Sequence, residues 1–184
     1  MSDWFQTITD IDVGPAEAEQ VATAVLEWLI ASGIVVAELT DCAVGDGHAP
    51  GSNFGNAVRE ADPRLLGLQA NGMKVITGRT VFSSMDADRV TCPHCRSAID
   101  LHDGQDAWNQ LSATINGWYE GEQGSTACWV CGRAVGLNNW EWDPPWGFGY
   151  LGFQFWNWPP LEDRFVNDVA RRLGHRVVLP RGKL

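Results

Sequence analysis

Hydrophobic positions in the first forty residues predict a strand, a helix and a second strand. Residues 4–11 are the first strand candidate, although their alternation is imperfect. Gly14-Pro15 opens the helix, because proline suits a first helical turn, and Gly33 stands where a glycine commonly ends a helix. The β-branched residues 34–36 then favour a strand, which completes a β-α-β unit. The apolar helix positions fall on one stripe, at i, i+4, i+7 and i+8: Val21, Val25, Trp28 and Leu29.

The end of the chain repeats this order of elements. Residues 150–158 predict an aromatic strand that Pro159 stops, and residues 161–173 predict a helix. Acidic residues lie near the start of this helix and basic residues near its end, as the helix dipole favours. Gly174 ends the helix, and residues 177–179 form the last strand. The apolar face of the helix consists of Leu161, Phe165, Val169 and Leu173.

Two β-α-β units in one chain predict an α+β fold of the ferredoxin-like, split β-α-β type. Between the units we expect a Gly-rich loop with short extended segments at 64–68 and 74–83, and then an inserted subdomain. The predicted organisation is a discontinuous core of residues 1–41 and 147–184, a loop region of residues 42–89 and an insertion of residues 90–146.

The insertion contains two Cys-x-x-Cys pairs, at Cys92 and Cys95 and at Cys128 and Cys131. This spacing lets two thiolates reach one ion, and two such pairs complete the four-thiolate tetrahedron of a structural zinc site. The 32 residues between the pairs exceed the usual spacing, so we expect residues 106–119 to form a helix between them. The sequence therefore predicts a zinc-ribbon-like insertion.

Three other interpretations of these cysteines stay open at this stage. Disulfides are disfavoured because nothing in the first residues marks export. A redox site needs one reactive pair at a helix start rather than two matched pairs, and the ligands alone do not distinguish zinc from iron. A closed zinc site leaves no open position for substrate, so we expect it to be structural. His94, inside the first pair, is expected to face solvent.

Nine aromatic residues lie between positions 140 and 158. They could form a stacking platform, and the candidate ligand-binding residues there are Phe148, Tyr150, Phe153 and Trp156; burial in the core is the alternative. Residues 146–153 also resemble the RNP1 octamer of RNA-recognition motifs. Two departures weaken this: Trp146 occupies the basic position, and Phe5 is the only loose counterpart on the first strand.

Three weaker sets of residues complete the candidate chemistry. Cys42 and His48, in a Gly-rich loop, could act as a thiol nucleophile and its base in a hydrolase or transferase, although a cysteine at a strand end is more often a small buried hydrophobe. His102 and His175 have no partner visible in the sequence, so we expect structural roles. Residues 67–74 lack the Gly-Lys-Ser/Thr step that a P-loop requires.

Composition and charge narrow the function. The chain has 184 residues, 45% of them hydrophobic, and a net charge of -10, which fits a globular protein and opposes nucleic-acid binding. It has no apolar run of about 20 residues, so we expect a cytoplasmic protein without membrane contact. The nine carboxylates of residues 1–58 have no lysine or arginine among them, and such a surface suits a basic protein partner.

Several C-terminal segments resemble an uncharacterised bacterial family with two Cys-x-x-Cys pairs. They are residues 144–149, 151–153, 155–161 and 172–178. Some members carry the automatic label "sugar ABC transporter ATPase", which implies a P-loop that this chain lacks, so the resemblance implies roles for the four paired cysteines alone. We expect a non-catalytic, structural-zinc protein of the adaptor or immunity type, with the Cys42–His48 hydrolase and RNA binding as alternatives.

Overall fold

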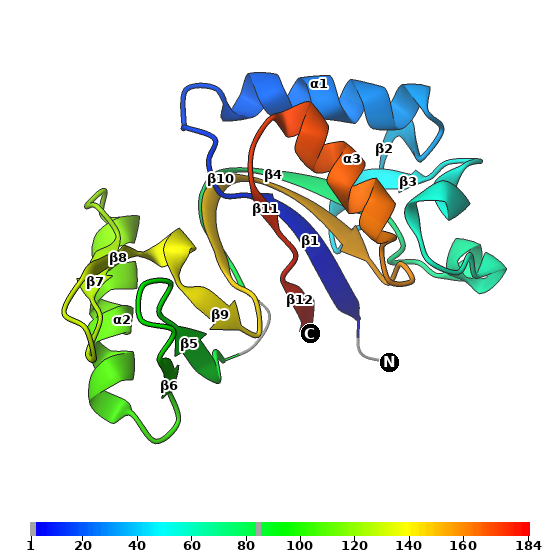
Figure 1. Ribbon diagram of the computed structural model, residues 1–184. Helices are drawn as coiled ribbons and strands as arrows, with labels where there is room; N and C mark the ends of the chain where they lie inside the picture. The colour runs from blue at the N-terminus through cyan, green and yellow to red at the C-terminus, as the bar shows by residue number, and fades with distance from the viewer. Residues whose placement is uncertain (1–2, 84–85) are drawn as a thin grey trace.

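The computed structural model describes residues 3–83 and 86–184, which form a mixed α+β structure. Figure 1 shows two parts: a large curved sheet with helices above it, and a smaller lobe at one end. The strands of the large sheet are β1 (Trp4–Asp10), β2 (Val35–Asp41), β3 (Asp46–Pro50), β4 (Met73–Phe82), β10 (Gly147–Trp156), β11 (Val177–Val178) and β12 (Arg181–Lys183).

The large sheet is antiparallel, and its strand order is β11-β1-β10-β4-β3-β2, with β12 also paired to β1. β10 lies in the middle, with β1 on one side and β4 on the other. β1 and β10 come from opposite ends of the chain, so the sheet closes only after most of the chain is synthesised. β2 forms the far edge and pairs with β3 alone among the described strands.

Two helices cover one face of this sheet, α1 (Ala18–Ala31) and α3 (Asp163–Leu173). Their apolar stripes pack on the sheet residues Ile8, Leu151 and Phe155 to form the main core. The helices also touch each other, since the ring of Trp28 stacks on that of Phe165 at 6.2 Å between centroids. Both helices therefore lie where the apolar periodicity of the sequence places them.

Glycines end both helices as the sequence predicts. Gly33 and Gly174 have φ values of 69° and 73°, a left-handed conformation that costs a residue with a side chain more than it costs glycine. The chain turns there and enters the next strand, β2 after α1 and β11 after α3.

The sheet corrects the prediction for residues 42–89. The segment 64–68, predicted as extended, lies in a 3₁₀ helix, η2 (Pro63–Gly67), because Pro63 fixes a helical first turn. The predicted Gly-rich loop contains β3, and the segment 74–83 lies in the ten-residue strand β4. These two strands separate β2 from β10, so much of the segment 42–89 belongs to the main sheet, whereas its last residue, Arg89, begins the lobe strand β5 (Arg89–Thr91).

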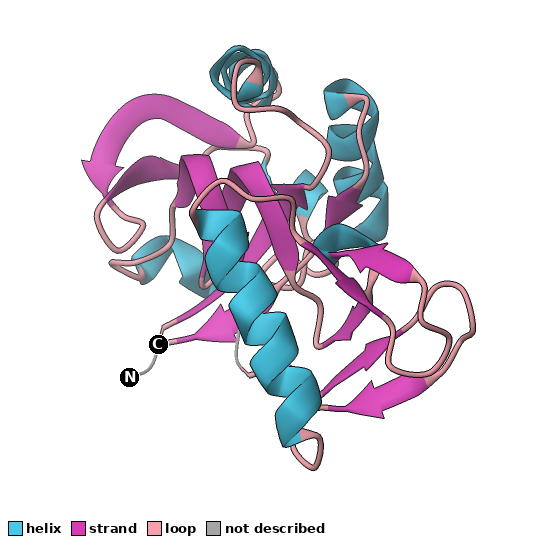
Figure 2. Cartoon of the chain, turned by 90° about the vertical axis from the view of Figure 1, so that its left-hand side faces the viewer, coloured by secondary structure: helices cyan, strands magenta, loops and turns pink. Residues whose placement is uncertain are grey.

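The smaller lobe is built from short elements. Its strand β5 pairs with β6 and β9, and β7 pairs with β8; Figure 2 views the molecule from the side of this lobe. A second apolar cluster, which includes Leu111, Ile115 and Trp140, fills it. The elements are β5 (Arg89–Thr91), β6 (Ala98–Asp100), α2 (Gln105–Tyr119), β7 (Ser125–Ala127), β8 (Ala134–Gly136), the 3₁₀ turn η3 (Leu137–Asn139) and β9 (Glu141–Asp143); a further 3₁₀ turn, η1 (Phe54–Ala57), lies outside it.

None of the helices in the described part of the chain combines the length and the apolar character that crossing a bilayer requires.

Candidate metal centre

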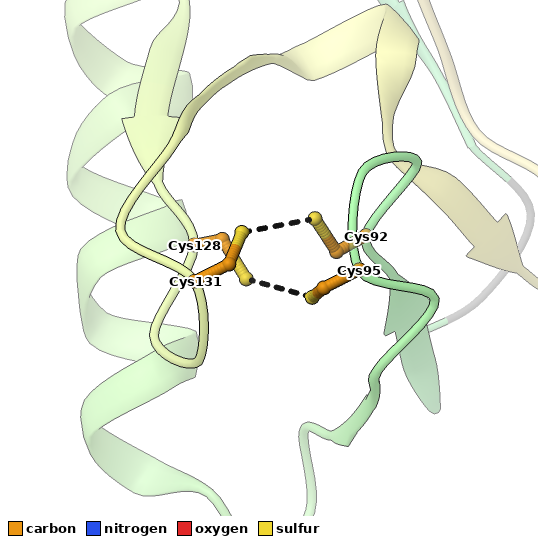
Figure 3. A group of neighbouring side chains, drawn as sticks. All are labelled: Cys92, Cys95, Cys128 and Cys131. Atoms are coloured by element: carbon orange, nitrogen blue, oxygen red, sulfur yellow. Dashed lines mark hydrogen bonds between the residues drawn. The ribbon is translucent and has the colours of Figure 1, made fainter.

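The two cysteine pairs occupy the turns of two β-hairpins in the smaller lobe. Cys92 and Cys95 lie between β5 and β6, and Cys128 and Cys131 lie between β7 and β8. The helix α2 connects the hairpins, close to the predicted 106–119. Figure 3 shows the two turns facing each other with their sulfurs between them.

The two turns have the same backbone geometry, position for position. The backbone N–H groups of His94 and Val130 donate to the sulfurs of Cys92 and Cys128, at 3.4 and 3.5 Å. The backbone N–H of Arg96 donates to the carbonyl of Cys92, and the backbone N–H of Gly132 donates to the carbonyl of Cys128. Each turn therefore holds its first sulfur with a backbone donor before any ion binds.

Both turns place their fourth residue after the first cysteine in the left-handed region. The φ value is 60° at Arg96 and 71° at Gly132. Glycine adopts this conformation freely, whereas arginine does so at a cost of about 1–2 kcal/mol. The first turn thus carries a strain that the second avoids.

The distances between sulfurs match a single tetrahedral ion. The sulfurs of Cys92 and Cys131 lie 3.9 Å apart and those of Cys95 and Cys128 lie 3.8 Å apart, and all four lie within 4.8 Å of one another. A tetrahedron with Zn–S bonds of about 2.3 Å has edges of about 3.8 Å. The four cysteines can therefore hold a metal ion, and no other group of three or more ligands in the described residues comes so close together.

The site lies at the lobe surface, with one side buried. Cys92 and Cys128 are buried, Cys95 is half-buried and Cys131 is exposed. Hydrogen bonds from Ser97 lower the pKa of Cys95 to about 6. At Cys131 a backbone hydrogen bond from Arg133 lowers the pKa, but burial and the neighbouring thiols outweigh it and raise the value to about 11.

These opposed pKa values describe the four thiols without a metal ion. Without an ion, one thiol ionises easily and its neighbours then resist further loss of protons, because the thiolates repel one another. An ion of charge +2 stabilises all four thiolates, so binding releases protons and weakens as the pH falls. A tetrahedral ion bound by all four sulfurs would have no ligand position left for substrate or water.

The geometry also bears on the alternatives for these cysteines. All five cysteines are free, and neither pair stands at a helix N-terminus, where a redox pair has its reactive thiolate. The spacing fits one ion, and a tetrahedral set of four thiolates suits iron as well as zinc, so the geometry leaves the choice between them open. His94 is exposed, as predicted.

The described hydrogen bonds do not join Cys42 to His48. The Nδ1 atom of His48 is hydrogen bonded to the carbonyl oxygen of Val36 at 2.9 Å, and no hydrogen bond among the described residues joins the ring to Cys42. Cys42 is buried beside Gly72, whose backbone N–H donates to the Cys42 carbonyl. Both residues therefore hold β2, β3 and the start of β4 together.

The aromatic candidates are mostly core residues rather than an open platform. Phe148, Phe153 and Trp156 are all at most 5% exposed. Phe148 packs in the lobe cluster and Phe153 in the main core. Tyr150 is half-buried beneath the guanidinium of Arg79, 5.2 Å from its ring centroid. The RNP1 resemblance fails for this reason, because its aromatic side chains must lie open on one sheet face to stack on bases.

Sequence reasoning missed one residue that joins the lobe to the sheet. The side-chain amide of Asn138 donates to the carbonyls of Ile11 and Phe148, and its oxygen accepts the N–H of Phe148 at 2.9 Å. An asparagine in a stretch of mixed polar residues gives no signal of such a role. The contact fixes η3 on the first and central strands of the sheet.

Two further contacts that the sequence did not reveal are the partners of the lone histidines, and they agree with the structural roles expected for them. Nδ1 of His175 lies 2.8 Å from the carboxylate of Asp10, which is fully buried. The same carboxylate accepts backbone N–H bonds from Asp12 and Val13. His102 likewise has a partner, Asp88, at 2.8 Å. These partners are 165 and 14 residues away in sequence, so no local pattern announces them.

Comparison with known proteins adds no relative to this picture. No protein-family model matches the chain, and neither a curated protein nor a solved structure matches it. The resemblance inferred from the C-terminal segments therefore stays a prediction, and the argument for function rests on the residues themselves.

Proposed function

We propose that this protein is a non-catalytic recognition module that contains a structural zinc ion and binds a basic protein partner, in the manner of an adaptor or an immunity protein. The observation that carries the proposal is the four-sulfur cluster, whose spacing suits an ion with every ligand position filled. Such an ion stabilises a lobe and supplies no reactive position.

Zinc is the ion that this donor set favours. Four thiolates at the corners of a tetrahedron, on two tight turns with backbone donors to sulfur, are typical of structural zinc. Zinc has no redox chemistry of its own, which agrees with a site that has an architectural role.

Charge supports recognition of a basic partner. Residues 1–58 contain no lysine or arginine, and seven of their nine carboxylates, all except Asp10 and Asp12, take part in no ion pair among the described residues. A field of this kind steers and orients a partner of opposite charge. Nucleic acid is disfavoured because its phosphates repel this surface.

The strand order supports the finer description of the fold in part. In the order β11-β1-β10-β4, the strand β4 takes the place beside β10 that a ferredoxin-like core gives to the strand after its first helix, and β2, which follows α1, lies two strands further out. Two hairpins that meet at an ion support a zinc-ribbon-like lobe. Four reduced thiols fit the cytoplasm as the compartment.

Two measurements test the proposal. Elemental analysis of protein purified under reducing conditions is expected to give one zinc per chain; protein that is folded and free of metal would overturn the zinc assignment. Tagged, zinc-loaded protein is expected to retain a basic protein at about 150 mM salt and release it at about 1 M, because such contacts are screened. Recovery of the tagged protein alone would overturn the recognition role, and labelling of Cys42 by a thiol-reactive probe in zinc-loaded protein would favour the hydrolase.

A further inference from the structure

The outer edge of β2 differs from every other part of the large sheet. Among the described strands, none pairs with its outer side, and all residues from Val36 to Asp41 are exposed. The opposite edge is formed by the two- and three-residue strands β11 and β12. β2 therefore presents the longest row of unpaired backbone N–H and C=O groups that the sheet offers.

The side chains of this edge combine apolar and acidic groups. Val36 and Leu39 are 37% and 61% exposed, and the acids Glu38 and Asp41 each follow one of them by two residues. None of the described ion pairs includes either acid. Exposed edge strands are commonly protected from pairing by a lysine, a proline or a bulge. β2 has a register shift between Val35 and Leu39, but it contains neither lysine nor proline.

Hollows flank the edge on its helix side and at its end. Leu39 lines a groove of about 390 Å³ together with Leu26 of α1, His48 of β3 and Lys74 of β4, and Lys74 is the single base in that lining. At the end of the strand, Asp41 and the 48%-exposed Val44 line a second hollow of about 710 Å³ with Leu68. Each hollow has one β2 residue in its lining, Leu39 in the first and Asp41 in the second.

A single side chain fixes the position of the edge. His48 lies opposite Leu39 in the register of β2 and β3. The Nδ1 atom of its ring is hydrogen bonded to the carbonyl oxygen of Val36, within the stretch where the register shifts. This contact replaces ladder hydrogen bonds on the inner side of β2. The outer side is left free for a partner, and Figure 1 shows it at the end of the sheet away from the metal lobe.

We infer that the outer edge of β2 binds an extended basic segment of the partner as an additional strand. The inference rests on the proposed recognition function and names its docking site. Main-chain hydrogen bonds would supply affinity, and alternate side chains would supply specificity: bases beside Glu38 and Asp41, and apolar groups against Leu39 and the groove. A second copy of this chain suits the edge poorly, because it would bring the same acids together.

The test uses full-length, zinc-loaded protein and a fluorescent peptide of about eight residues in which lysine and valine alternate, a length that spans the strand. Fluorescence anisotropy is expected to show saturable binding that weakens with salt. The double variant Glu38→Lys/Asp41→Lys is expected to bind about tenfold or more weakly, because repulsion replaces attraction at the edge. The matched control Asp106→Lys/Glu120→Lys makes the same charge change on exposed residues of the other lobe and is expected to change binding less than about twofold.

Two further measurements separate strand addition from general attraction. N-methylation of alternate peptide amides removes donors from one side of an added strand, so one of the two possible methylation patterns should abolish binding and the other should preserve it. Hydrogen exchange of the Val36–Asp41 amides should slow when the peptide binds. Equal losses in both lysine variants, equal binding of both methylated peptides, or unchanged exchange at β2 would each overturn the inference.

The failure of this inference can be told apart from failure of the proposed function. A captured partner that binds Glu38→Lys/Asp41→Lys as tightly as the parent protein would overturn the docking edge and leave the recognition role standing. Sedimentation that shows a dimer broken by the same variant would assign the edge to a second copy and overturn the inference. Absence of any partner would overturn the recognition role and the inference with it.

Discussion

The large sheet and the metal lobe are stabilised in different ways. The sheet has long central strands and two helices, and its core contains side chains such as Leu29, Leu151 and Phe155 that are fully buried. The lobe has three-residue strands and a smaller cluster, into which the ligands Cys92 and Cys128 are themselves packed. Short strands on a small core are marginal without a staple. We therefore expect apolar burial to stabilise the sheet by itself, and the lobe to need a metal ion at its four cysteines.

Removal of the metal ion has the largest expected effect and should separate the stability of the lobe from that of the sheet. Structural zinc contributes about 10–16 kcal/mol of binding free energy in small domains, so a chelator or Cys92→Ser should unfold the lobe and leave the sheet folded. Hydrogen exchange resolved by segment measures both: fast in α2 and β5, protected in β1 and β10. Cys42→Ala is the control and should keep the metal. A lobe that stays protected without metal would contradict the prediction.

A cavity in the main core should destabilise the sheet and leave the metal lobe unchanged. Phe155 is fully buried between the rings of Trp158 and Phe165, so Phe155→Ala should lower the free energy of unfolding of the sheet by about 3–5 kcal/mol. Denaturant titration measures the loss, and the zinc content of the folded fraction should not change. Leu39→Ala, at an exposed position, should change stability by less than about 0.5 kcal/mol. Loss of zinc in Phe155→Ala would show that the two regions fold as one unit.

The contact between the regions can be weakened on its own. Asn138→Ala leaves the carbonyl and N–H of Phe148 and the carbonyl of Ile11 without their side-chain partner, which should cost about 1–3 kcal/mol. Thermal unfolding should then separate into two transitions, as the lobe loosens from the sheet. Asn139→Ala removes one 3.4 Å contact to Arg176 and serves as the control. A single unshifted transition in Asn138→Ala would contradict this role.

The strained turn of the metal site offers a stabilising change. Arg96→Gly should relieve the left-handed backbone and raise the stability of the lobe by up to about 1 kcal/mol, less the small contribution of the exposed Arg96–Glu141 ion pair. Gly132→Ala should lower it by a similar amount, since the same conformation is required there. The midpoint of lobe unfolding, followed by tryptophan fluorescence, measures both. Changes of the same sign in the two variants would count against the shared geometry.

The smallest effect concerns acid unfolding at the junction. Hydrogen bonds from Arg176 hold the pKa of Asp12 below its usual 3.8. A carboxyl group whose pKa is lowered in the folded state stabilises the fold at pH values above its unfolded-state pKa. This stabilisation is lost as the pH falls through the folded-state pKa. Asp12→Asn should therefore lower stability at neutral pH by less than about 1 kcal/mol and flatten its pH dependence between about pH 5 and pH 2. Unchanged slope in a pH series of denaturant titrations would contradict the assignment.

Local patterns predicted the elements whose own residues determine them. Gly33 and Gly174 mark helix ends, and the stripe Val21, Val25, Leu29 faces the core. The strand β3 escaped prediction because its sequence, Asp-Gly-His-Ala-Pro, lacks alternation and β-branched residues; its pairing with β2 holds it extended. Likewise, the density of aromatic residues near β10 did not reveal which were covered, because that depends on both the helices and the lobe.

The sequence by itself indicated the four cysteines that can hold a metal ion and the helices, because chelate spacing and helical periodicity are properties of neighbouring residues. Tertiary structure alone decided that β2 forms the exposed edge of the sheet, that His48 turns to a backbone carbonyl instead of Cys42, and that Asn138 joins the lobe to β10. The physical reason is that strand order and side-chain partners are set by contacts between distant segments, which compete across the whole fold and leave no mark on any single stretch of chain.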